Sequence, residues 1–187
     1  PAGAKAFAAA LAASPAVPAA ERAALASARE ALAPACDGTT AYAAPPPVAS
    51  PLGRQFQDYL AGTAAFYAGG FEAARQHFAA LQASSQPWLR ETARYMLGRV
   101  AVNKAQAAAV DDYGVLNRDH VDAAALAEAD RAFRAYLRDY PKGLYAASAQ
   151  GLLRRVDWLG GQPRKLAADY AWSFAHPGPD ERNVSTA

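Results

Sequence analysis

Apolar residues recur at helical spacing from the first residues of the chain onward. Between positions 18 and 32, Leu25, Ala28 and Leu32 fall three and four residues apart, on one helix face. The stretch 2–13 is also helix-forming, and two prolines mark the turn between the segments. A short connection between two such segments predicts a helical hairpin over residues 1–34.

A proline-rich stretch follows this hairpin. Five prolines fall between Pro34 and Pro51, so we expect no helix there and assign residues 35–52 to an extended connector. From 53 to 175, helical patterns alternate with Gly-Gly turns and proline breaks. Residues 176–187 are polar and are expected to form a flexible tail.

Composition strengthens the helical prediction. Of 187 residues, 52 are alanine, none is isoleucine, and valine plus threonine supply only 14 positions. Alanine is the best helix former, whereas strands favour β-branched and aromatic side chains. The chain is therefore predicted to be all-α.

Small and aromatic residues recur in the same order in the helical region after the connector. A glycine, an alanine and a phenylalanine appear twice in the same order: Gly62, Ala74 and Phe78, then Gly98, Ala129 and Phe133. The two glycines are 36 residues apart. The step from glycine to alanine is 12 residues in the first copy and 31 in the second, which indicates a 19-residue insertion around 105–122.

These anchors have expected structural tasks. The small residues, including Gly151 in a weaker third copy, are expected to let two helices approach closely, with Phe78 and Phe133 filling the gap toward the next helix. Pro87 and Pro141 are expected to stop the second helix of each copy.

This pattern resembles the tetratricopeptide repeat, a helix-turn-helix unit of about 34 residues. The resemblance covers residues 53 to about 172 and implies an α-solenoid preceded by the N-terminal hairpin. A narrower similarity covers 132–155, which looks like a junction in the repeat lipoproteins that serve outer-membrane β-barrel assembly. It depends on Phe133, Tyr140, Pro141, Gly143, Tyr145 and Ala149. This similarity implies a periplasmic or cell-envelope location, the alternative being the cytoplasm; Gly143 replaces the usual serine, and no lipid-attachment cysteine lies at the start.

The solenoid resemblance also implies a concave groove lined by the helices that carry the glycine anchors. The residues expected to contact a partner there are Tyr59, Thr63, Tyr67, Tyr95, Arg99, Asn103 and Arg155. Tyrosine and arginine dominate the energetics of many interfaces. An aromatic at any one of these positions could equally be core between neighbouring helices. Arg99 and Asn103 escape that alternative because they are polar and share one helix face.

The insertion holds the residues that could carry chemistry: Asp111, Asp112, Asp119, His120 and Asp122. Carboxylates with a histidine could ligate a divalent cation. Their spacing fits no known coordination loop, and a solvated loop in which Asp122 caps the next helix is the favoured interpretation. The sequence has no nucleophile elbow or phosphate-binding glycine loop, so we predict neither an enzyme nor a cofactor.

Charge and hydropathy restrict the partner. The net charge is only +2, which gives no indication of nucleic-acid binding, and no run of 18 strongly apolar residues predicts a transmembrane helix. We expect a non-enzymatic scaffold that binds a peptide or protein partner in the groove. Two alternatives remain: an N-terminal structural module of a longer solenoid without its own ligand, and a metal site in the acidic insertion.

Overall fold

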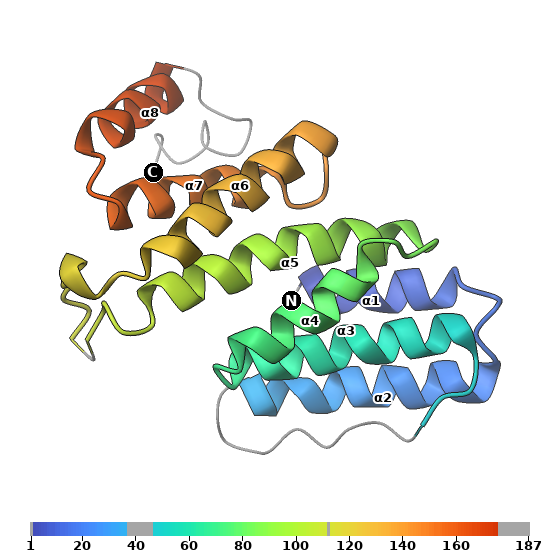
Figure 1. Ribbon diagram of the computed structural model, residues 1–187. Helices are drawn as coiled ribbons and strands as arrows, with labels where there is room; N and C mark the ends of the chain where they lie inside the picture. The colour runs from blue at the N-terminus through green and yellow to red at the C-terminus, as the bar shows by residue number, and fades with distance from the viewer. Residues whose placement is uncertain (1, 37–46, 112, 176–187) are drawn as a thin grey trace, which may run out of the picture.

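The computed structural model describes residues 2–36, 47–111 and 113–175, and these are all-helical apart from turns and one isolated bridge between Val110 and Leu116 (Figure 1). This confirms the all-α prediction. The helices are α1 (Ala2–Ala12), α2 (Ala19–Cys36), α3 (Pro51–Tyr67), α4 (Phe71–Leu81), α5 (Pro87–Gln106), the 3₁₀ turn η1 (Arg118–His120), α6 (Ala123–Asp139), α7 (Ala146–Leu159) and α8 (Pro163–Ala175).

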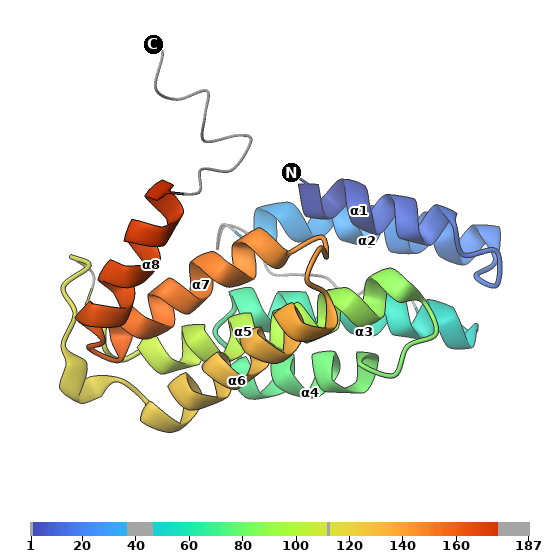
Figure 2. The same ribbon diagram turned by 90° about the horizontal axis from the view of Figure 1, so that it is seen from above.

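Helices that follow one another in the chain pack together. From α3 to α8 each helix contacts the next, and α5 also contacts both α3 and α7. The helices α3, α5 and α7 therefore form one layer, with α4 and α6 on one side of it (Figure 2). The α1–α2 hairpin lies on the opposite side, where α2 packs on α3 and α1 reaches α5.

The start of α3 is fastened to α2 by a carboxylate. Glu21 of α2 accepts hydrogen bonds from the Ala49 N–H at 3.0 Å and from the Ser50 hydroxyl, and Ser50 caps α3 by accepting from the Gly53 N–H at 3.1 Å. The Ser50 hydroxyl, the largest influence, lowers the pKa of Glu21. These hydrogen bonds therefore join α2, before the predicted connector, to the start of α3, after it.

Two proline predictions need correction. The helix α2 continues through Pro34 to Cys36, because proline in a last turn removes only one backbone hydrogen bond. Pro87 does not end α4, which stops at Leu81; it is the first residue of α5, where its missing N–H has no helical partner to lose.

The repeated glycines meet the repeated phenylalanines. A Cβ placed on Gly98 would lie 2.6 Å from the Phe133 ring, and one on Gly62 would lie 3.2 Å from the Phe78 ring. Both rings are fully buried. Each phenylalanine thus packs on the glycine of its own helix pair, and the predicted packing of both rings toward the next helix stays a prediction. Gly151 is exposed with nothing within 4 Å, so the predicted close approach there is wrong.

The different surroundings of Gly98 and Gly151 predict opposite effects of alanine substitution on the free energy of unfolding. Gly98→Ala should destabilise the chain by about 1–2 kcal/mol, since overpacking costs about 1–3 kcal/mol and the helix preference for alanine returns part of it. Gly151→Ala, the matched control on exposed helix, should stabilise it by roughly 0.5–1 kcal/mol. Urea unfolding followed by circular dichroism measures both. Equal effects of the two substitutions would contradict the close helix approach at Gly98.

A hydrogen-bond network around Glu91 and Tyr136 lies against Gly143. The Tyr136 hydroxyl donates to Glu91 Oε1 at 2.8 Å and accepts from the Tyr145 N–H at 2.9 Å. The Leu144 N–H donates to the same Glu91 oxygen. A Cβ on Gly143 would lie 2.5 Å from Glu91 Oε1 and 2.6 Å from the Tyr136 oxygen. A side chain at position 143 would have to displace this network, which accounts for the glycine there.

Candidate partner-binding face

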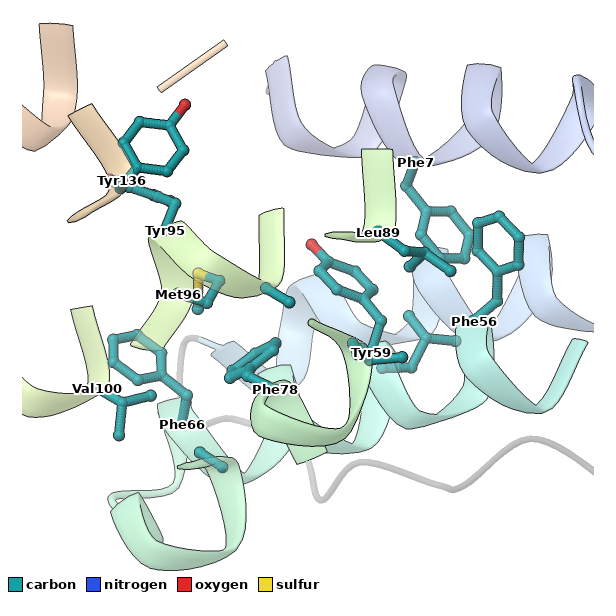
Figure 3. Packing of buried hydrophobic residues seen from close by; sticks show 14 of the residues in the cluster. Phe7, Phe56, Tyr59, Phe66, Phe78, Leu89, Tyr95, Met96, Val100 and Tyr136 are labelled. Atoms are coloured by element: carbon teal, nitrogen blue, oxygen red, sulfur yellow. The ribbon is translucent and has the colours of Figure 1, made fainter. Parts of the chain in front are cut away.

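The α1–α2 hairpin covers the first part of the predicted groove. Phe7 of α1 inserts between Phe56, Tyr59 and Trp88, with ring centroids 5.5, 5.6 and 5.9 Å away (Figure 3). Tyr59 keeps only 7% of its surface exposed, and Thr63 is buried with its hydroxyl donating to the Tyr59 carbonyl oxygen. Both are core residues rather than accessible contact residues, which corrects the prediction for these two positions.

Tyr95 is also part of the core. Its ring stacks on Tyr145 with centroids 4.4 Å apart, and its hydroxyl is 2.6 Å from the Ser148 hydroxyl. It therefore joins α5 to α7, and the prediction that it contacts a partner is wrong. Tyr145 bonds Thr92 at 3.0 Å, and burial, the largest influence, raises its pKa to about 12, so it stays neutral at physiological pH.

The remaining predicted residues lie outside the part of the groove that the hairpin covers, and five contacts connect them through Phe66 and Gln106. The Arg99 guanidinium lies 4.9 Å from the centroid of the Phe66 ring, which in turn packs edge-on against Tyr67. The Asn103 side chain donates to the Arg99 carbonyl oxygen at 2.9 Å. Gln106 donates to Asn103 and accepts from Arg155 Nε at 2.8 Å.

We call this set the open face: Phe66, Tyr67, Arg99, Asn103, Gln106, Arg155 and Trp158. It runs from the end of α3 across the second half of α5 to α7. Tyr67 is 48% exposed, and the polar members are partly buried. Arg155 ends the row with its guanidinium 4.3 Å from the centroid of the Trp158 ring. The structure thus brings together four of the seven predicted residues and buries the other three.

The two arginines of the open face have no ion pair among the described residues. Neither Arg99 nor Arg155 has a carboxylate of this part of the chain within ion-pair distance. Within the same residues, arginines such as Arg22 and Arg90 also lack one, whereas five others pair with a carboxylate. Examples are Arg134, 2.9 Å from Asp130, and Arg94, which binds Asp139. Instead, each open-face guanidinium lies over an aromatic ring. A cation held in this way is oriented. Arg155 donates its Nε–H to Gln106, and Arg99 donates one N–H to the Met96 sulfur, so the other N–H groups of each guanidinium are those that a partner could contact.

Three members of the open face, Phe66, Gln106 and Trp158, are not among the residues predicted to contact a partner. Gln106 lies seven residues after Arg99, which places it two turns along the same side of α5. Trp158 lies three residues after Arg155, a spacing that lets the two side chains meet on a helix. The helix spacing alone could therefore have indicated Gln106 and Trp158.

The acidic insertion does not assemble a metal site in the part of the chain that the structure describes. No group of three potential ligands comes together among those residues, and Asp112 lies outside them. The Asp111 carboxylate accepts from the N–H groups of Tyr113 and Val115, and Asp122 caps α6 through the Ala125 N–H. The cap at Asp122 is the one the sequence predicts.

None of the described helices is both long and apolar enough to span a membrane. No protein-family model, curated protein or solved structure matches this chain significantly. The resemblance to tetratricopeptide repeats therefore depends on the sequence pattern alone.

Proposed function

We propose that this chain is a non-enzymatic scaffold that binds a peptide or protein partner on the open face, within a tetratricopeptide-like solenoid. The observation that carries the proposal is the row of connected polar and aromatic side chains, with Arg99 and Asn103 at its centre. A location in the cell envelope belongs to the same proposal and depends on the sequence junction around Pro141.

The chemistry of the open face supports binding rather than catalysis. Arginine and aromatic residues at the centre of a surface are the types that contribute most to binding energy. Their positions are already fixed by stacking and hydrogen bonds within the protein, so little side-chain entropy remains to be lost on association. The hydrogen bonds described for the open face join amide and guanidinium groups, and none of them pairs a nucleophile with a base.

Panning a displayed library of random 12-residue peptides against the folded chain tests this function. We expect enriched clones to lose at least ten-fold in binding to the double variant Arg99→Ala, Asn103→Ala. The matched control is Arg134→Ala, which removes an arginine from α6 that pairs with Asp130. Clones that bind the double variant as well as the original chain would contradict the proposal, and so would the absence of enriched clones.

The alternative of a structural module has its own supporting observation. The outer side of α8 exposes Tyr170 and Phe174, the latter by 84%, at a position where a further helix could pack. The same panning separates the two functions. A module without its own ligand predicts that no selected peptide depends on Arg99 or Asn103.

A further inference from the structure

Two arginines of the open face have no carboxylate partner. They are Arg99 of α5 and Arg155 of α7, and neither has an ion pair among the described residues. We infer that the open face binds an acidic polypeptide segment whose Asp or Glu carboxylates pair with these guanidinium groups. This inference rests on the proposed function and names the chemistry of its partner.

The positions of Arg99 and Arg155 indicate how such a segment would lie. Arg155 reaches Gln106, which is seven residues beyond Arg99 on α5, so the two contact points are on the order of 10 Å apart along the helix. An extended chain covers about this distance in three residues. Carboxylates at every third position would then reach both arginines.

A polypeptide fits this face better than a nucleic acid does. The whole chain carries only +2 net charge, too little to hold a phosphate backbone by charge alone. The planar guanidinium groups, each backed by an aromatic ring, instead present forked N–H donors that match a carboxylate in bidentate fashion.

Charge-matched probes test the inference. The probe is a 12-residue peptide of Ser and Ala with Glu at every third position, labelled with tetramethylrhodamine. Its counterparts carry Gln or Lys in place of Glu, and a 12-nucleotide oligothymidine serves as the phosphate probe. Fluorescence anisotropy should show the Gln peptide binding at least ten-fold more weakly than the Glu peptide, and the Lys peptide not binding.

Variants assign the binding to Arg99 and Arg155. Arg99→Gln and Arg155→Gln should each weaken the Glu peptide about five- to ten-fold, whereas Arg134→Gln, the matched control, should stay within two-fold. Equal binding of the Glu and Gln peptides overturns the acidic partner while leaving the panning result intact. Binding to none of the peptides, tighter binding of oligothymidine, or an equal loss with Arg134→Gln overturns it too.

Discussion

Replacing Phe133 with alanine is expected to lower the free energy of unfolding by about 3–5 kcal/mol, the usual cost of removing a fully buried phenylalanine. The ring is fully buried and packs on Gly98, so no neighbouring side chain can move in to fill the space. It also lies 6.2 Å from the Tyr95 ring, which joins α5 to α7. Urea unfolding of the variant measures the loss.

Phe174→Ala is the matched control for this change. Its ring is 84% exposed on α8, so the same truncation should shift stability by no more than about 0.5 kcal/mol. A loss at Phe133 as small as the loss at Phe174 would show that the glycine contact is not a packing centre of the α5–α6 pair. A large loss at both would show that something covers α8 in solution.

The local pattern predicted much of the fold because its signals are local. Helix propensity, glycine turns and the Asp122 cap each depend on residues a few positions apart, and the structure has a helix, a turn and a cap at those places. The glycine and phenylalanine anchors also predicted buried contacts in two copies. The prediction for Gly151 is wrong because no atom of the described residues lies within 4 Å of a Cβ placed there. Residue spacing alone cannot show which side of α7 another helix covers.

The candidate site could be predicted only in part, and the reason is a long-range contact. Nothing in the pattern of α3 says that Phe7, about fifty residues earlier, packs against Tyr59. Tyr59 and Thr63 were therefore assigned to a surface that the hairpin covers. Arg99 and Asn103 escaped this error, because long polar side chains resist full burial wherever the neighbouring helix lies.

Phe7→Ala is expected to release α1 from the rest of the protein, with a loss of about 3–5 kcal/mol in the interactions that hold it. Phe7 is 1% exposed and touches three aromatic rings on α3 and α5. Leu11 is the other large apolar residue of α1 and is also buried, while most of the remaining residues are alanines, which bury little area. Amide hydrogen exchange should therefore accelerate about 100-fold or more in residues 2–12.

The regional pattern of that exchange decides between two states of the hairpin. Lys5→Ala, an exposed position on the same helix, is the matched control and should leave exchange unchanged. If Phe7→Ala speeds exchange in α1 but not in α5 and α6, the hairpin is a separable cover over Tyr59 and Trp88, and its release extends the open face. Uniform acceleration across all helices would instead make the hairpin part of one cooperative core, in which case the open face is confined to the residues beyond it.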